Sequence, residues 1–202
     1  MKLSNKFTLT RIIFAPVFLI IYFIPIWTGK LQALSMYVAI PLLILAEFTD
    51  FLDGHYARKH NEVSDFGKLF DPFADIILHM TTFMCFMSSV SGEGYMKPWI
   101  FALILYREMT MNFIRMVAAK KGTAIAARKG GKLKTVFYVI SGFFALFLEA
   151  VTRINAELIP ENAFATLRIV SLVLFIICVL LSYISFIDYI VHFGKILKQE
   201  DK

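Results

Sequence analysis

The chain has 202 residues, a length that suits one domain, and 58% of them are hydrophobic, with a mean hydropathy of +0.69. This composition excludes an ordinary soluble protein. The formal net charge of +6 suits contact with anionic lipid headgroups, so nucleic acid is not needed as a partner. Only two cysteines occur, both in apolar runs, which gives no disulfide framework and no thiolate metal site.

Six apolar runs follow in chain order, each long enough for a helix to cross about 30 Å of hydrocarbon. They cover residues 11–28, 33–51, 68–90, 97–119, 133–152 and 164–193. A secretory signal peptide is the alternative interpretation of the first run, but no small-x-small cleavage site follows it. We therefore predict an all-α integral membrane protein, a six-transmembrane-helix bundle that forms a single domain over residues 1–202.

Lys and Arg are concentrated in every second connection, which predicts the orientation of the chain. They gather before the first run, around residues 58–68, throughout 120–134 and after the last run. The opposite connections carry few, and Arg153 lies in the last of them. Because positive residues remain on the cytoplasmic side, we predict that both termini are cytoplasmic and that the chain is a multi-pass protein of the inner (cytoplasmic) membrane.

The segment DFLDGHYARKHNEVSDFGKLFDPFAD, residues 50–75, is unusually acidic for so apolar a chain. Asp50 and Asp53 are three residues apart, and Asp71 and Asp75 are four apart, so each pair lies on one face of its helix. The short turn between the two helices makes them antiparallel neighbours. We therefore expect the four carboxylates to converge at the cytoplasmic boundary of the membrane.

These four carboxylates need compensating positive charge, either from basic residues or from bound cations. Arg58 alone does not balance them, whereas two Mg²⁺ or Mn²⁺ ions, which prefer oxygen ligands, do. Acidic residues within membrane spans are functional by default. The pattern therefore favours a two-ion metal site.

Three small residues extend the acidic faces, namely Gly54, Ala57 and Gly67. They allow the helices to pack closely, or they leave a slot where a flat base or a diphosphate lies against the backbone. The basic segment 120–135 also has two interpretations: a solvated positive anchor, or a rim that binds phosphate through glycine amides and lysines. Both pairs of alternatives remain open from the residues alone.

A two-metal carboxylate site stabilises a transferring phosphoryl group and activates the attacking oxygen. At a membrane boundary it suggests one lipid substrate and one water-soluble substrate. Asp75 lies deepest along its helix and is the predicted general base. A divalent-cation transporter is the alternative from another class. It needs a polar pathway on both sides of the membrane, and the outer halves of the predicted spans are nearly bare of polar residues.

The spacing Asp50-x2-Asp53-Gly54-x2-Ala57-Arg58-x8-Gly67-x3-Asp71-x3-Asp75 resembles the full signature of the CDP-alcohol phosphotransferase family. That family transfers a phosphatidyl or phospho-alcohol group from a CDP-linked donor to an alcohol and releases CMP. The resemblance implies a homodimer in which the four aspartates hold two metal ions, with Asp71 and Asp75 also catalytic. The residues that it assigns to CDP are Asp53, Gly54, Ala57, Arg58 and Gly67.

Three further stretches, NKFTLTRIIFAPVFL, YREMTMNFIRM and GKLKT, resemble bacterial phosphatidylglycerophosphate synthases, which join CDP-diacylglycerol to glycerol 3-phosphate. The residues that this resemblance assigns to the acceptor phosphate are Thr8, Arg11, Arg107, Arg115, Lys132 and Lys134. Ile76 stands where the typical synthase has Lys. Other substrates therefore stay open: inositol phosphate or serine as acceptor, or CDP-choline or CDP-ethanolamine with diacylglycerol.

Other polar residues inside the predicted spans include a charged pair and a histidine. Arg107 and Glu108 are adjacent charges whose burial is costly unless they are paired. They form a structural pair or they contact substrate, and the sequence leaves both open. His79 comes four residues after Asp75 and is expected to form a hydrogen bond within the bundle.

Overall fold

The computed structural model describes residues 3–59, 65–122 and 129–197, and it describes the backbone alone for 3–5, 50, 51, 53–59, 65, 66, 68, 129 and 194–197. The elements in chain order are α1 (Leu3–Thr28), α2 (Gln32–Lys59), α3 (Asp65–Cys85), β1 (Ser88–Ser89), β2 (Gly92–Glu93), α4 (Pro98–Lys120), α5 (Lys129–Ile154), the short 3₁₀ helix η1 (Ala156–Leu158) and α6 (Glu161–Leu197). The described chain is thus helical, as predicted, apart from one small β-hairpin.

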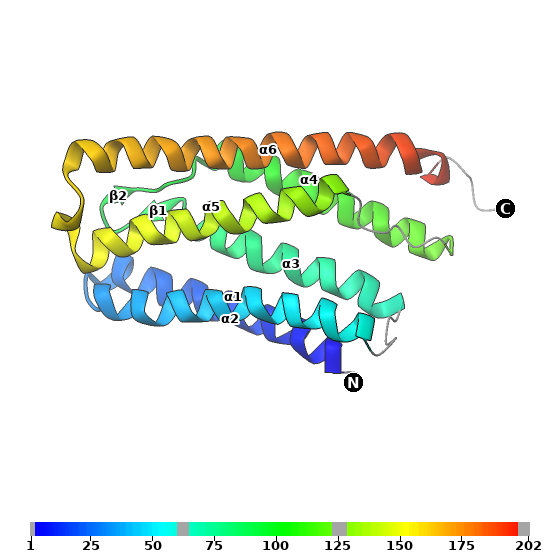
Figure 1. Cartoon of the computed structure of the whole chain (residues 1–202), viewed down its shortest axis with the longest axis horizontal. Helices are drawn as coiled ribbons and strands as arrows, with labels where there is room; N and C mark the ends of the chain where they lie inside the picture. The colour runs from blue at the N-terminus through cyan, green and yellow to red at the C-terminus, as the bar shows by residue number, and fades with distance from the viewer. Residues whose placement is uncertain (1–2, 60–64, 123–128, 198–202) are drawn as a thin grey trace.

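The six long helices lie alongside one another in an elongated bundle (Figure 1). The start of α1 and the end of α6 lie at one end of the bundle, here called the terminus end. The β1–β2 hairpin and η1 lie at the opposite end, here called the hairpin end. The last turns of α2 and the first turns of α3 also lie at the terminus end, so the two helices bring the acidic signature there.

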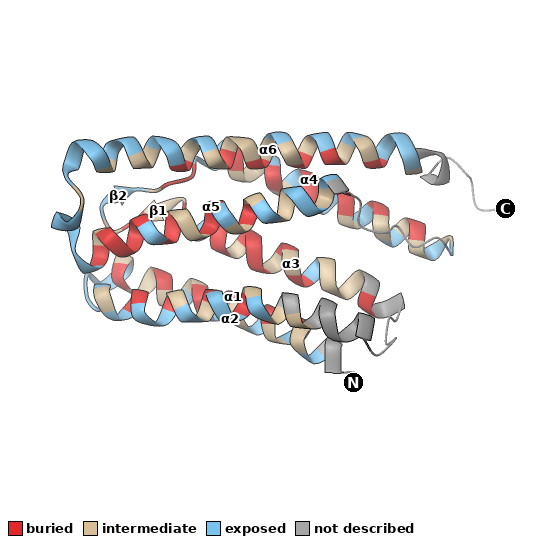
Figure 2. Ribbon diagram, in the orientation of Figure 1, coloured by how far each residue is buried: buried red, intermediate tan, exposed pale blue. Residues whose placement is uncertain are grey.

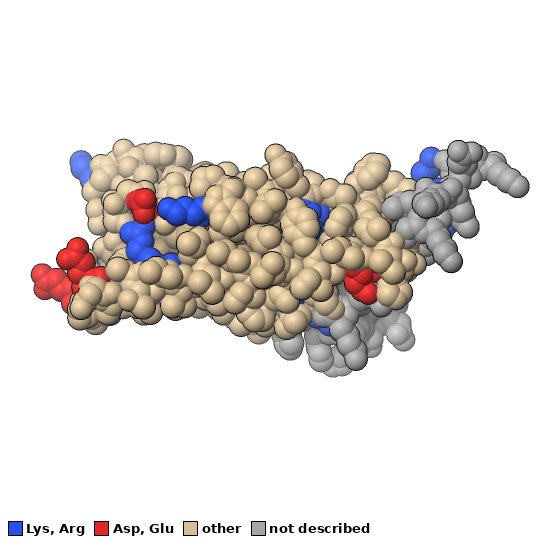
Figure 3. All heavy atoms as spheres, turned by 90° about the horizontal axis from the view of Figure 1, so that it is seen from above, with Lys and Arg blue, Asp and Glu red and all other residues tan. Residues whose placement is uncertain are grey.

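Four helical segments are long and apolar enough to cross a membrane: Lys6–Thr28, Gln32–Thr49, Gly130–Ile154 and Glu161–Phe193. In the described part of the chain α3 and α4 do not reach this measure, since both carry several charged residues. Large apolar side chains are exposed along α1 and α6, as a lipid-facing surface requires. Uncharged residues form most of the face seen in Figure 3. These are the features of a multi-pass membrane protein.

The core of the bundle lies around α3, which packs between the other helices. Phe83 of α3 is fully buried, and its ring centre lies 5.2 Å from those of both Tyr138 on α5 and Phe175 on α6. Both pairs have the edge-to-face geometry that aromatic rings prefer. Figure 2 shows the buried positions along α3 and α5 and the exposed outer face of α6. This packing fixes the position of α3 along the axis of α5, and therefore the relative position of their polar residues.

The third predicted run, residues 68–90, is helical only as far as Cys85, which corrects its predicted end. The chain then forms the β1–β2 hairpin. Gly92 has a φ of +101°, a conformation that favours glycine. A Cβ on Gly94 would lie 2.2 Å from the carbonyl carbon of Met87, so no larger residue fits without a backbone shift. The glycines therefore turn the chain where the apolar pattern alone continued the helix.

A buried ion pair joins the helices at the hairpin end. Glu149 and Arg153 lie one turn apart on α5, and Arg153 Nε donates to Glu149 Oε1 over 2.7 Å. Both side chains are fully buried. Arg153 Nη1 also donates to the Tyr22 carbonyl of α1 and to Ser35 Oγ of α2, each over 3.0 Å. One guanidinium group thus connects three helices.

Glu149 extends the same ion pair to the hairpin. Its Oε2 accepts hydrogen bonds from Ser89 Oγ over 2.6 Å and from the Tyr95 hydroxyl over 2.8 Å. Burial raises the pKa of the Tyr95 phenol above its usual value, so this group stays a donor. The prediction that placed Arg153 in an outer connection was wrong. Arg153 belongs to the last turn of α5, because Glu149 compensates its charge inside the protein.

Candidate active site

The predicted aspartates lie at the terminus end of α2 and α3. Asp71 and Asp75 are one turn apart on α3, and both are half-buried. Asp50 and Asp53 belong to the last turns of α2, but their side chains lie outside the described part of the chain. The same holds for three residues predicted to bind CDP, Gly54, Ala57 and Arg58, whereas Gly67 is buried in the first turn of α3. The convergence of all four carboxylates therefore stays a prediction.

Two buried residues of α1 contact the aspartates of α3. Thr8 Oγ1 donates a hydrogen bond of 2.6 Å to Asp71 Oδ1, and Arg11 Nη1 forms an ion pair with Asp75 Oδ1. The side chain of Arg11 is fully buried, so its charge must be compensated within the protein. Charge-assisted contacts of this kind hold a carboxylate in a defined orientation. Thr8 and Arg11, which were predicted to bind the acceptor phosphate, thus contact predicted metal ligands in this structure.

The groups on α3 fit a hard divalent cation. Asp71 and Asp75 offer carboxylate oxygens, the ligands that Mg²⁺ and Mn²⁺ prefer. The guanidinium of Arg11 already places a positive charge against Asp75. Among the residues whose side chains are described, no three of His, Cys, Asp or Glu come close enough together to hold a metal ion. A complete ligand set therefore needs the two aspartates of α2, as the signature predicts.

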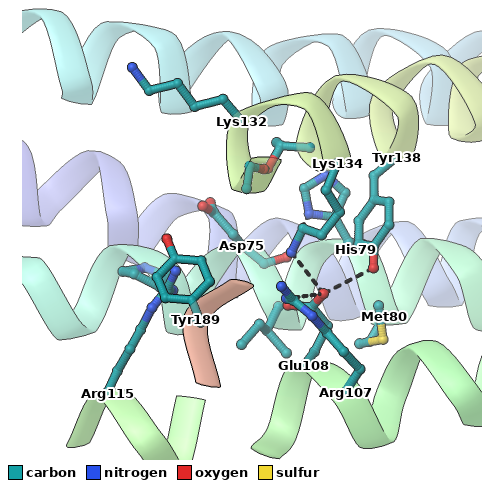
Figure 4. Close-up of a pocket in the computed structure, with 14 residues that line it drawn as sticks. Asp75, His79, Met80, Arg107, Glu108, Arg115, Lys132, Lys134, Tyr138 and Tyr189 are labelled. Carbon is teal, nitrogen blue, oxygen red and sulfur yellow. Dashed lines mark hydrogen bonds and ion pairs between the residues drawn. The ribbon is translucent and has the colours of Figure 1, made fainter. Parts of the chain in front are cut away.

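A cavity of about 170 Å³ lies beside Asp75, between α3, α4, α5 and α6 (Figure 4). The polar side chains that line it are those of Asp75, His79, Arg107, Glu108, Arg115, Lys132, Lys134, Thr135, Tyr138 and Tyr189. Four of these are cationic and two are carboxylates, so with a neutral His79 the described lining has a formal net charge of +2. A concave site of that charge attracts phosphate groups.

Glu108 is the centre of the charged network in this cavity. Its Oε1 accepts hydrogen bonds from Arg107 Nη1 over 2.9 Å, from Lys134 Nζ over 2.7 Å and from the Tyr138 hydroxyl over 2.9 Å. Arg107 Nε donates in turn to the Ser182 carbonyl of α6 over 2.9 Å. Arg107 and Glu108 thus form the pair that was one of their two predicted roles. Because both also line the cavity, the pair lies within reach of a bound ligand.

Four of the six residues predicted to bind the acceptor phosphate line this cavity. Two of them are held by Glu108. The guanidinium of Arg115 lies 5.9 Å from the centre of the Tyr189 ring, and Lys132 extends away from Glu108 (Figure 4). The other two predicted residues, both on α1, are not among the described residues that line it. Of the six residues predicted to bind the acceptor phosphate, the two on α1 therefore contact the aspartates of α3, and the other four line the cavity.

Sequence reasoning missed Glu47 and Tyr138 near the site. His79 Nδ1 forms the expected hydrogen bond within the bundle, to the Asp75 carbonyl over 2.9 Å, and its Nε2 lies 3.5 Å from Glu47 Oε1. Glu47 precedes Asp50 by three residues, a spacing that signals a shared helix face. Tyr138 follows Lys134 by four residues, which is the same kind of signal. Both were visible in the sequence but inconspicuous among apolar residues.

Comparison with known proteins shows the class of protein to which the whole chain belongs. The family model for CDP-alcohol phosphatidyltransferase matches residues 1–194. The chain belongs to the CDP-alcohol phosphatidyltransferase family. It is a transferase of phospholipid biosynthesis, which confirms the family predicted from the signature. The alternative of a cation transporter is not favoured.

Bacterial relatives are similar to most of the transferase. A Treponema pallidum protein named CDP-diacylglycerol–glycerol-3-phosphate 3-phosphatidyltransferase is 34% identical over an alignment of 208 positions. The alignment covers 98% of this chain and 92% of the relative. A Bacillus subtilis protein of the same name is 34% identical over 146 residues, or 69% of this chain and 74% of the relative. A Mycobacterium tuberculosis protein named "Probable phosphatidylglycerophosphate synthase" is 30% identical over 190 residues, or 94% and 80%.

Proposed function

We propose that the transferase moves the phosphatidyl group of CDP-diacylglycerol to glycerol 3-phosphate and releases CMP. The names of the relatives support these substrates. One observation on this chain supports the acceptor: Asp75, the predicted base, lines the same cavity as four cationic side chains. An alcohol whose phosphate binds those cations has its hydroxyl within the same small cavity as a carboxylate. Serine is a zwitterion with no net charge, so it gains less from the excess of positive charge than a phosphate dianion does.

In the proposed reaction the acceptor hydroxyl attacks the phosphorus on the diacylglycerol side of the donor diphosphate. A new P–O bond forms, the P–O bond to CMP breaks, and Asp75 accepts the hydroxyl proton. Arg11 holds one oxygen of Asp75 and so orients the carboxylate. Lys134 and Arg107 bind the acceptor phosphate, with Arg115 and Lys132 as further donors. The products are the phosphatidylated acceptor, CMP and a protonated Asp75.

The residues that would hold two Mg²⁺ or Mn²⁺ ions are Asp50, Asp53, Asp71 and Asp75. When bound, such ions stabilise negative charge on the diphosphate and on the transferring group. Thr8 orients Asp71 for this role through its hydrogen bond. The residues proposed to accommodate CDP are Asp53, Gly54, Ala57, Arg58 and Gly67, where the small side chains leave room against the backbone.

The proposed topology has all six helices crossing the inner membrane, as one domain with both termini and the active site on the cytoplasmic side. The start of α1 and the end of α6 lie at the same end of the bundle, which an even number of crossings requires (Figure 1). Helices α3 and α4, with 21 and 23 residues, are about 32 Å and about 35 Å long, enough to cross the hydrocarbon. Arg107 and Glu108 of α4 are buried, so their charges avoid lipid. The family resemblance also suggests a homodimer.

A panel of acceptors tests the proposed substrates. Purified transferase in lipid vesicles receives radiolabelled CDP-diacylglycerol and Mg²⁺ together with glycerol 3-phosphate, inositol phosphate or serine. A further arm supplies CDP-choline with labelled diacylglycerol. We expect kcat/KM for glycerol 3-phosphate to exceed that for every other acceptor by about 100-fold or more. Equal use of another acceptor, or transfer only from CDP-choline, would show that the proposed substrates are wrong.

A further inference from the structure

The acceptor site contains a carboxylate that the proposed reaction does not use. Glu108 is 4% exposed, yet all three side chains that donate to it, those of Arg107, Lys134 and Tyr138, line the cavity. They come from two helices, α4 and α5. A carboxylate in a phosphate-binding site weakens the attraction for anions, so its presence needs a physical reason.

We propose that Glu108 is a positioning residue of the acceptor site, which aims Lys134 and Arg107 at the phosphate and limits the charge of the cavity to that of one phosphate dianion. This inference rests on the proposed function, because it concerns how the acceptor is oriented. Glu108 touches neither the acceptor hydroxyl nor the transferred phosphorus in this account. It acts through the two cations that it holds.

The geometry of the cations supports this role. Lys134 has a long flexible side chain, and a partner that holds it in one conformation fixes the direction from which its ammonium group contacts a bound phosphate. Its Nζ lies 2.7 Å from Glu108 Oε1 and 4.8 Å from the centre of the Tyr138 ring, so it is fixed from two sides. Arg107 is fixed by Glu108 and by the Ser182 carbonyl. Lys132 extends away from this cluster (Figure 4).

A second buried carboxylate in the same bundle shows what a purely structural pair looks like. Glu149, at the hairpin end, is 0% exposed and also binds a cation and a tyrosine hydroxyl. None of the described residues bonded to Glu149 lines the cavity. If Glu108 served only to join helices, its partners would have no need to face the cavity as they do.

The variant Glu108→Gln separates orientation from affinity. Loss of the carboxylate changes the formal charge of the described lining from +2 to +3, so phosphate binding is retained or strengthened. Lys134 and Arg107 lose their common partner, so the acceptor binds without its hydroxyl being directed to Asp75. We expect kcat with glycerol 3-phosphate to fall about tenfold or more. We also expect the Kd for inorganic phosphate, measured by titration calorimetry, to stay equal or decrease.

Two comparisons make the experiment decisive. Glu149→Gln is the matched control, and at a temperature where all variants are folded it should change neither kcat nor the Kd for phosphate by more than about twofold. In the background of Lys134→Ala, Glu108→Gln should lower kcat by less than about threefold, because a residue that acts through Lys134 has little left to position. Additive effects on kcat would overturn the proposal, as would a parallel loss of phosphate binding and kcat.

Two outcomes need separate treatment. If Glu108→Gln does not fold, Glu108→Asp is the variant to test, since it keeps the charge and moves it by about one methylene. We then expect kcat to fall about threefold or more while phosphate binding is unchanged. An unchanged kcat would overturn the proposal. If wild-type transferase does not use glycerol 3-phosphate, the proposed function fails by that result alone. The same variants are then assayed with the acceptor that is used, which tests Glu108 independently.

Discussion

At the scale of single residues, two threonines of α1 differ in the partners of their hydroxyl groups. Thr8 and Thr10 are two positions apart, so they face different surroundings on the helix. Thr8 Oγ1 donates to Asp71, and Thr10 Oγ1 donates to the Lys6 carbonyl of its own helix over 2.9 Å. Only the first of these hydrogen bonds reaches a residue proposed to bind metal.

We expect Thr8→Val to lower kcat about tenfold and to raise the Mg²⁺ concentration for half-maximal rate, because a hydrogen bond to a charged group is worth about 1.5–3 kcal/mol. The measurement is initial rate against Mg²⁺ concentration in vesicles. Thr10→Val is the control and should stay within about twofold of wild type. Equal effects of the two substitutions on kcat would show that Thr8 has no specific role in the active site.

The sequence predicted the aspartates but not the residues that hold them. Helix spacing identifies groups on the same helix, as it did for Asp71 and Asp75. The contacts from Thr8 and Arg11 join positions 63 and 64 residues apart, which no helical period encodes. Their assignment to the acceptor phosphate came from resemblance alone, and the structure places them against carboxylates.

At the scale of elements, one buried ion pair connects several segments at the hairpin end. Arg153 of α5 binds α1 and α2, and Glu149 binds the β1–β2 hairpin. We expect Arg153→Ala to destabilise the protein by about 3–5 kcal/mol, because it leaves Glu149 buried without a counter-ion. The expected fall in Tm is roughly 10 °C, measured by fluorescence in detergent.

The control for this substitution is Glu157→Ala, which removes an exposed acidic residue from η1 at the same end of the bundle. It should change Tm by about 1 °C or less. We also expect Arg153→Ala to keep the wild-type KM for glycerol 3-phosphate below its Tm, since the cavity lies away from this ion pair. A Tm equal to that of wild type would mean that other contacts hold the hairpin end.

The six apolar runs predicted the six helices because hydrophobic length is a strong signal in membrane proteins. The ends of the helices were less predictable. α3 ends at Cys85, and the chain then turns through a hairpin in which Gly92 has a positive φ and Gly94 lies close to the backbone of Met87. Apolar composition does not record these local backbone conformations. The pairing of Glu108 with Lys134, across 26 positions and between two helices, depends on how α4 and α5 pack. Only the structure provides that packing.

At the scale of the whole molecule, the proposed topology is open to direct measurement. Cys85 and Cys178 are buried, so they give little background in cysteine labelling. We expect Glu157→Cys, at the hairpin end, to react with a membrane-impermeant maleimide in intact cells. Lys120→Cys, at the end of α4, should react only after the membrane is permeabilised. Labelling of both from outside would contradict the proposed orientation.

In the proposed reaction a carboxylate of α3 accepts the proton of the acceptor, beside a phosphate-binding cavity. The most direct measurement is the rate of transfer from labelled CDP-diacylglycerol to glycerol 3-phosphate by Asp75→Asn. The control is Asp188→Asn, which alters a partly exposed residue paired with His192 on α6. We predict that Asp75→Asn lowers kcat about 1,000-fold, while Asp188→Asn stays within about twofold. The rates are compared below the Tm of each variant, because Asp75→Asn also removes the carboxylate that is paired with buried Arg11. Near wild-type turnover by Asp75→Asn would contradict the account.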